Sequence, residues 1–179
     1  MGNKKEEILP DREFALDLLR NLKIQHSVRR HSEKVADKAL DIAKKITKAK
    51  VDMNLIEIGA LLHDIGRTTT HGFKHALIGG KILRGRGFSD KLAKICERHI
   101  LGGLDKGDAK RFGLPEKDYL PITLEEKIIC LADKHMAGTR EVTINERFKR
   151  WFQKYGRSKI LIKSKRRIEA IQKEIERLM

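Results

Sequence analysis

A histidine and an aspartate stand side by side at positions 63 and 64, where a strongly apolar stretch of the chain ends. The preceding residues 55–62 read LIEIGALL, with Glu57 as the only charged side chain. This composition predicts a helix that is buried nearly all round. A carboxylate that leaves water without a partner costs several kcal/mol, so Asp64 requires a cation or strong hydrogen-bond donors near it.

Two further polar residues occupy similar surroundings elsewhere in the chain. His31 lies inside an apolar stripe with helical spacing, and Asp133 follows the apolar run IICLA. Imidazole and carboxylate are ligands for zinc, manganese, iron or cobalt, and facing helices of a bundle often carry such ligands. Neighbouring residues diverge by about 100° around a helix. His63 and Asp64 therefore reach one site most easily at a helix end, which we expect Gly66 to produce as a C-cap glycine.

Helical periodicity recurs along the whole chain, and strand signals are almost absent. The pattern predicts an all-α protein. Asp52 and Ser89 are expected N-caps, and the segment 102–122 is a long connection with room for one short helix. The expected helices span residues 11–22, 27–47, 52–66, 73–84, 89–101, 124–133 and two more from 144 onward that are broken at 155–157.

The bulk composition fits one soluble domain of 179 residues, with 40% hydrophobic and 36% charged residues. No apolar run is long enough for a membrane span and no signal peptide is evident, so we expect a cytoplasmic protein without a membrane partner. Cys96 and Cys130 lie in apolar stretches and are expected to be core residues. The net charge is +15, and residues 147–179 hold 12 Lys and Arg against 3 Asp and Glu.

The order of the segments RHSEKVADKAL, LLHDIG and LAD resembles the HD-domain superfamily of metal-dependent phosphohydrolases, specifically its HDIG subset. The resemblance covers residues 27–140. It implies an HD-domain helical bundle over residues 1–142, with a basic helical extension over 143–179 packed on the same domain. It also implies that His31, His63, Asp64 and Asp133 are metal ligands.

Two other histidines match positions that bind a second ion in some HD proteins. These are His75 in FKHALIGGKIL and His99 in CERHILGG. The resemblance leaves two alternatives: two ions bound by all six residues, or one ion with His75 and His99 in support. The ligand order is similar to that of bacterial HD hydrolases that split diadenosine tetraphosphate. The stretch GLPEKDYLPITLEEKIICLAD is closer to small archaeal HD proteins of unassigned activity.

The resemblance implies hydrolysis of a phosphoester or phosphoanhydride, in a nucleotide-like substrate, by water activated on one or two divalent ions (Fe, Mn, Co, Ni or Zn). Asp64 would bridge two ions or position the water. A phosphohydrolase also needs cations at the phosphoryl oxygens. Arg67 and Lys134 directly follow the HDIG and Asp133 positions and are the expected catalytic cations. Lys74 and Arg140 are further phosphate-binding candidates, although in a chain with 40 Lys and Arg any one of these can be a solvated surface charge.

Two alternative functions accompany this interpretation. The basic C-terminal helices, with Trp151, Phe152 and Tyr155, could grip RNA or DNA, although Trp151 and Phe152 also suit core positions. A metal-holding scaffold without activity is the third class of function. The apolar spacing from Leu161 to Leu178 is explained equally by docking onto the domain or by a homodimer. His26, His71 and His135 match no family position, and His71 shares the loop between two expected ligands.

Overall fold

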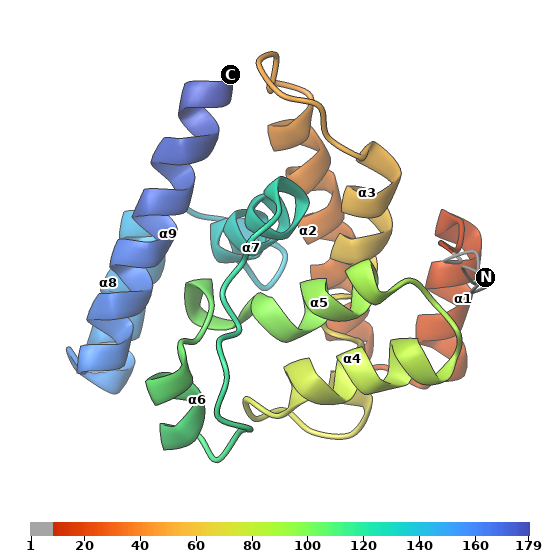
Figure 1. Ribbon diagram of the computed structural model, residues 1–179, viewed down its shortest axis with the longest axis horizontal. Coiled ribbons are helices and arrows are strands. Elements are labelled where there is room, and N and C mark those ends of the chain that lie inside the picture. The colour runs from red at the N-terminus through yellow and green to blue at the C-terminus, as the bar shows by residue number, and fades with distance from the viewer. Residues whose placement is uncertain (1–8) are drawn as a thin grey trace, which may run out of the picture.

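The computed structural model describes residues 9–179 and shows an all-α fold with one very short hairpin (Figure 1). This confirms the fold class that the periodicity predicts. The elements are α1 (Arg12–Asn21), α2 (His26–Ala43), α3 (Met53–Leu62), η1 (Ile65–Thr68, a 3₁₀ helix), α4 (His75–Gly85), α5 (Asp90–Arg98), η2 (Ile100–Gly102, a 3₁₀ helix), α6 (Lys106–Arg111), α7 (Leu124–His135), β1 (Met136–Ala137), β2 (Arg140–Glu141), α8 (Ile144–Tyr155) and α9 (Lys159–Leu178).

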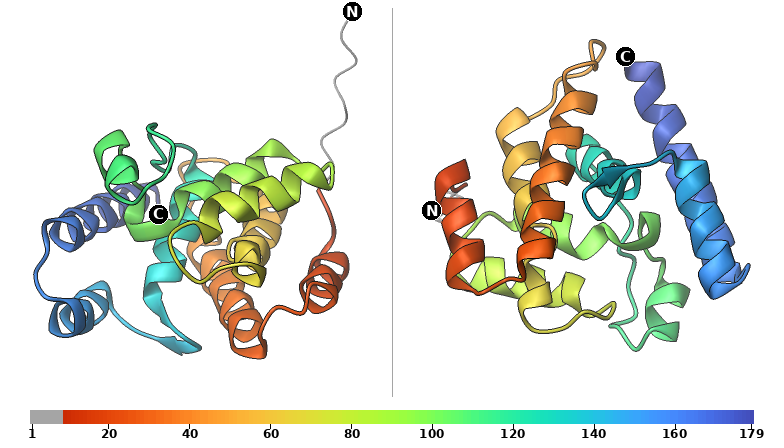
Figure 2. Two further views of the ribbon diagram at one scale, coloured as in Figure 1. Left: turned by 90° about the horizontal axis from the view of Figure 1, so that it is seen from below. Right: turned by 180° about the vertical axis from the view of Figure 1, so that it is seen from behind.

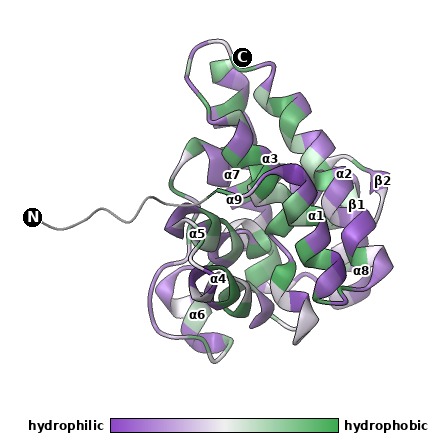
Figure 3. Cartoon of the chain, turned by 90° about the vertical axis from the view of Figure 1, so that its right-hand side faces the viewer, coloured by the Kyte–Doolittle hydropathy of each residue, from purple (hydrophilic) through white to green (hydrophobic). Residues whose placement is uncertain are grey.

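The helices α2, α3 and α7 form the centre of the molecule, and α4 packs along α5 beneath them. Helix α1 and the antiparallel pair α8–α9 lie on opposite sides of this centre (Figures 1 and 2). Figure 3 shows the mainly hydrophobic colour of α3 and the alternating colour of the amphipathic α8. Every residue of α3 from Ile58 to Leu62 is buried, as its composition predicts.

Most helix starts follow the expected capping chemistry. Asp52 accepts a hydrogen bond from the backbone N–H of Leu55, and Ser89 accepts one from Lys91.

Some helix boundaries differ from expectation. Helix α2 ends at Ala43 rather than near residue 47, and α5 ends at Arg98 because Leu101 adopts a left-handed conformation with φ of 53°. The connection 102–122 contains α6, and the β1–β2 hairpin has no counterpart in the sequence prediction.

Gly66 does not end α3, so its expected role as a C-cap glycine is wrong. Helix α3 ends at Leu62, and Gly66 lies within η1 without a positive φ angle. Its importance is steric instead. A Cβ atom at this position would lie 1.9 Å from the carbonyl oxygen of His75 and 2.6 Å from the backbone nitrogen of Gly79. Glycine at position 66 therefore allows η1 to touch the backbone of α4.

Helix α9 docks onto the domain through the apolar stripe noted in the sequence. Ile168, Ile171 and Ile175 belong to the main hydrophobic core. Arg167 adds polar anchors, because its guanidinium donates to the carbonyl oxygen of Gly103 at 2.7 Å and pairs with two carboxylates of the α6 region. The apolar stripe of α9 is therefore buried against other parts of the same chain. The division of the chain at residue 142 stays a prediction.

Cys96 and Cys130 are free and buried, which confirms them as core residues. Their thiols donate to the carbonyl oxygens of Leu62 and His99, and burial raises the pKa of Cys130 to about 11. Among residues 9–179, none of the helices combines the length and apolar character that a membrane crossing requires.

The contact at Gly66 gives the first prediction. The Gly66→Ala substitution should lower the free energy of unfolding by about 1–3 kcal/mol, because η1 and α4 must separate to admit the methyl group. Gly85→Ala in α4 is the matched control, since a Cβ there meets nothing within 4 Å. Urea unfolding of both variants measures the difference. Equal stability of the two variants would contradict the steric role of Gly66.

Candidate metal centre

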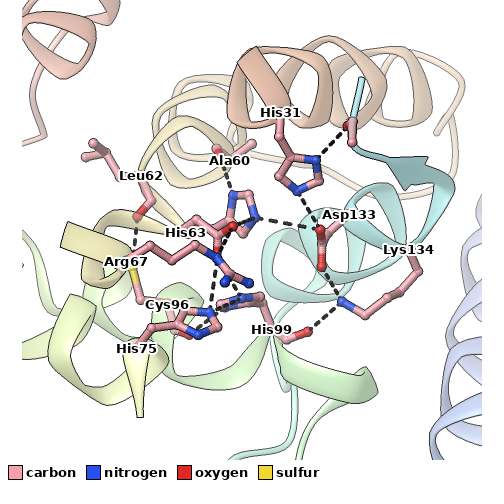
Figure 4. Close-up of polar contacts among 12 residues, drawn as sticks. His31, Ala60, Leu62, His63, Arg67, His75, Cys96, His99, Asp133 and Lys134 are labelled. Carbon is pink, nitrogen blue, oxygen red and sulfur yellow. Dashed lines mark hydrogen bonds and ion pairs between the residues drawn. The ribbon is translucent and has the colours of Figure 1, made fainter. Parts of the chain in front are cut away.

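Five separate segments bring the six sequence-predicted ligands to one place in the core (Figure 4). Helix α2 carries His31, and the end of α3 carries His63 and Asp64. The other three come from later elements: His75 begins α4, His99 follows α5, and Asp133 lies in the last turn of α7.

Asp64 lies between two imidazole rings. Its Oδ1 atom is 3.0 Å from Nε2 of His75 and 3.4 Å from Nε2 of His99. The two Nε2 atoms are themselves 3.2 Å apart. All three side chains are buried. One carboxylate oxygen and two ring nitrogens therefore face a common point that excludes most solvent.

Asp133 occupies the other side of the cluster. Its Oδ1 atom is 3.0 Å from Nε2 of His31 and 3.7 Å from Nε2 of His63. The same His63 nitrogen lies 3.7 Å from Oδ2 of Asp64. His63 thus stands between the two carboxylates and connects the two halves of the cluster.

The Nδ1 atom of every one of these histidines faces a backbone carbonyl oxygen at 2.7 or 2.8 Å. A carbonyl oxygen can only accept, so each Nδ1 carries the proton and donates it. In the neutral ring, the lone pair is then on Nε2, which points into the cluster. The pairs are His31 with Gly138, His63 with Ala60, His75 with Gly72 and His99 with Cys96.

In this tautomer the lone pairs of the Nε2 atoms face one another and the carboxylate oxygens. The Nε2 atoms of His75 and His99 face each other, and neither Nε2 of His63 nor Oδ1 of Asp64 has a hydrogen-bond partner although both are buried. Such groups repel unless a proton or a cation lies between them. The residues present therefore fit a divalent cation, which binds neutral imidazole nitrogens and carboxylate oxygens. The second nitrogen of each imidazole donates its N–H to a backbone carbonyl, as is usual for metal-binding histidines.

The cluster offers more than one place for an ion. Three overlapping triads each have one ligand atom per residue within 4.8 Å of the others. They are His31–His63–Asp64, His63–His99–Asp133 and Asp64–His75–His99.

The electrostatics of the cluster keep its carboxylates ionised. Burial raises the pKa of Asp64, but the surrounding histidines, His63 first and then His75 and His99, lower it well below its usual value. Burial likewise acts against the charge of Asp133, and Lys134 and the histidines outweigh it. In His63, burial lowers the pKa but the two carboxylates raise it more, whereas burial lowers the pKa of His99 to about 4. The centre thus holds two negative charges ready for a cation.

Two of the four predicted phosphate-binding cations border this cluster. Nε of Arg67 lies 2.7 Å from Oδ2 of Asp64. The buried Lys134 pairs with Asp133 and donates to the carbonyl oxygen of His99. Lys74 and Arg140 are exposed and do not line the cleft at the cluster. The geometry therefore favours Arg67 and Lys134 over Lys74 and Arg140.

The cluster opens into a cleft with a volume of about 520 Å³. His71 contributes to its wall, whereas His135 donates from Nδ1 to the carbonyl oxygen of Val142, outside the cluster. Phe73 and Arg147 also line the cleft, and the sequence prediction named neither as a site residue. Trp151 lines it too, whereas the sequence analysis considered Trp151 only as a nucleic-acid contact or a core residue. The available signal was weak: Arg147 and Trp151 are four residues apart on an expected helix and so share a face.

The chain belongs to the HD domain family, which matches residues 28–138 and thus more than half of the chain. The resemblance to the HD-domain superfamily of metal-dependent phosphohydrolases is therefore confirmed. The matched segment includes all six residues of the cluster.

Individual relatives extend this result. An uncharacterized protein of Methanocaldococcus jannaschii is 44% identical over 93% of this chain and 98% of its own length. A tRNA (cytidine(56)-2'-O)-methyltransferase of Thermoplasma volcanium is 40% identical over 80% of this chain, but the match spans only 41% of that enzyme. Among solved structures, the HD domain of the Listeria monocytogenes phosphodiesterase PgpH in complex with cyclic-di-AMP has a TM-score of 0.54 at 21% identity, covering 92% of this chain and 95% of that one.

The central position of His63 gives the second prediction. His63→Ala should lower the affinity for a divalent metal by at least about 100-fold, because it removes a nitrogen shared by both halves of the cluster. His135→Ala, a half-buried histidine outside the cluster, should keep the metal. Elemental analysis of both variants, with the change in melting temperature on adding a chelator, measures the effect. Equal metal content in wild type and His63→Ala would reject the metal centre.

Proposed function

We propose that this protein is a metal-dependent phosphohydrolase that cleaves a phosphoester or phosphoanhydride bond of a nucleotide. The observation that carries the proposal is the convergence, in one cleft, of inward-facing Nε2 lone pairs, two buried carboxylates and two adjoining cations. A site built from these groups supplies ligands for metal ions and binding groups for a phosphate at the same place.

The four residues of the HD pattern, His31, His63, Asp64 and Asp133, would hold the metal, and His75 and His99 would complete a second position. When bound there, a divalent ion of iron, manganese, cobalt, nickel or zinc makes water more acidic and withdraws charge from a phosphoryl oxygen. The carbonyl partners of the four imidazoles hold the rings in place, so the ligands are preorganised.

Arg67 and Lys134 act on the substrate in this proposal. Each is held at the cluster by one carboxylate, and each lines the cleft. Their donors are in place before the substrate arrives, so little reorganisation is needed when charge develops on the phosphoryl oxygens. Asp64 would orient the attacking water through a carboxylate oxygen, because its Oδ1 atom has no hydrogen-bond donor.

Three observations support a nucleotide as the substrate. The cleft volume of about 520 Å³ is within the range of small-molecule sites. Its wall includes the aromatic rings of Phe73 and Trp151, which offer surfaces for a base. The PgpH HD domain, which has the same fold, is seen in complex with cyclic-di-AMP.

Metal analysis of protein purified without added metal, followed by a phosphate-release screen of nucleotides and dinucleotides, tests the proposal. Absence of turnover by metal-loaded protein would reject it.

The position of Arg67 gives the third prediction. Arg67→Ala should lower kcat by about 100-fold or more with the metal retained, because one preorganised donor to the phosphoryl oxygens is lost. Lys74→Ala changes an exposed cation next to His75 in sequence and should leave kcat unchanged. Kinetics with the best substrate of the screen compare the two variants. A similar loss in both would show a general charge effect instead of a specific contact.

RNA is the second candidate substrate, because a domain similar to this chain occurs within the tRNA methyltransferases of Thermoplasma volcanium and Picrophilus torridus. In both cases the match spans 41% of the methyltransferase. The excess of positive charge in residues 147–179 agrees with such a role.

Salt dependence separates the two candidates and is the fourth prediction. If RNA is the substrate, its affinity should fall by about 1,000-fold or more between 50 and 200 mM salt, since several phosphate contacts release counterions. A mononucleotide should lose much less. Filter binding of tRNA at both salt concentrations, beside nucleotide hydrolysis under the same conditions, measures this. Weak, salt-insensitive RNA binding would exclude the second candidate.

A further inference from the structure

Arg147 is a half-buried cation that lacks a carboxylate partner. It lies in α8 and lines the same cleft as the metal cluster. Within residues 9–179, its guanidinium forms no hydrogen bond and no ion pair, and its Nε atom is buried without a partner. A guanidinium that is partly removed from water costs some free energy unless an anion meets it. Burial lowers the pKa of Arg147, and the charge of Asp133 offsets this only in part.

The aromatic residues of α8 hold this guanidinium in place. Its Cζ atom lies 4.9 Å from the centre of the Trp151 ring, one turn further along the helix. The Trp151 ring in turn meets the fully buried Phe148 edge to face, with centroids 5.1 Å apart. Stacking on a ring uses the face of the guanidinium and leaves its N–H edges free. The terminal Nη donors of Arg147 are therefore positioned and available, whereas its Nε atom is buried.

The other cations of the cleft differ from Arg147 in this respect. Arg67 and Lys134 are each paired with a carboxylate of the cluster. Arg147 makes no such pair, so the contacts do not tie it to the position where the proposed hydrolysis occurs. It also lies beyond residue 138, where the match to the HD domain family ends. Helix α8 thus brings to the cleft a binding group from outside the matched segment.

We propose that Arg147 binds a phosphate group of the substrate other than the one that is hydrolysed, so that the cleft selects nucleotides with at least two phosphates. A guanidinium edge suits phosphate oxygens because it can donate two parallel hydrogen bonds. Trp151 keeps the guanidinium at the cleft wall. The inference rests on the proposed function, because it assigns a substrate class to the same site.

The chain provides its own reporter for a binding experiment. Trp151 is its single tryptophan, so intrinsic fluorescence reports on the wall that Arg147 occupies. The protein as purified would be titrated with ADP and with AMP, and the ratio of the two dissociation constants would be taken from the titration midpoints. The wild type should bind ADP at least tenfold more tightly than AMP. In Arg147→Gln this preference should fall to within about twofold, since the charged hydrogen-bonding contact to the second phosphate is lost.

Arg150→Gln is the matched control. Arg150 is an exposed cation of the same helix that does not line the cleft, so its loss should leave the ratio unchanged. Arg147→Lys keeps the charge without the planar fork and should keep part of the preference. Three results would overturn the inference: a wild type without preference for ADP, an Arg147→Gln variant with the wild-type ratio, or equal losses in Arg147→Gln and Arg150→Gln.

The binding test is independent of turnover. If ADP preference depends on Arg147 but no nucleotide is hydrolysed, the proposed function fails and the binding role remains. If hydrolysis occurs but the preference does not depend on Arg147, only the inference fails.

Discussion

The structure depends on keeping two ionised carboxylates, Asp64 and Asp133, inside a helical core. Each costs several kcal/mol to bury unless opposite charge surrounds it. Arg67 and Lys134 supply part of that charge, and the packing of the helices brings the imidazole rings to the same carboxylates. Gly66 permits the close approach of η1 and α4 that places His75 at Asp64, and α2 brings His31 to Asp133. Helix packing and site formation are therefore one event, since the same contacts accomplish both.

The sequence predicts the helices well because their signals are local. Apolar periodicity and the caps at Asp52 and Ser89 depend on neighbouring residues only. It fails where a distant segment decides the conformation. Gly66 looks like a helix terminator from its own surroundings, yet the backbone of α4 explains it. Leu101 breaks its helix in a left-handed conformation that nothing in its residue type favours.

The candidate site shows the same division. The residues of the HD pattern can be found from the sequence because their types and spacing match a family. Spacing did not separate the four cations, whereas the structure distinguishes Arg67 and Lys134 from the exposed Lys74 and Arg140. Arg147 was not predicted as a site residue because what distinguishes it is the lack of a carboxylate partner. A sequence does not show which carboxylates lie near a given cation.

The backbone carbonyls that orient the four histidines have a consequence for the evolution of the protein. An oxygen that every amino acid possesses sets the direction of each ring, so the side chains at positions 60, 72, 96 and 138 do not themselves orient the histidines. Packing still restricts Ala60 and Cys96, which are buried, and the positive φ of Gly138 favours glycine there. Relatives can diverge at these supports without losing the ring orientations. Comparisons of residue identity alone would overlook them.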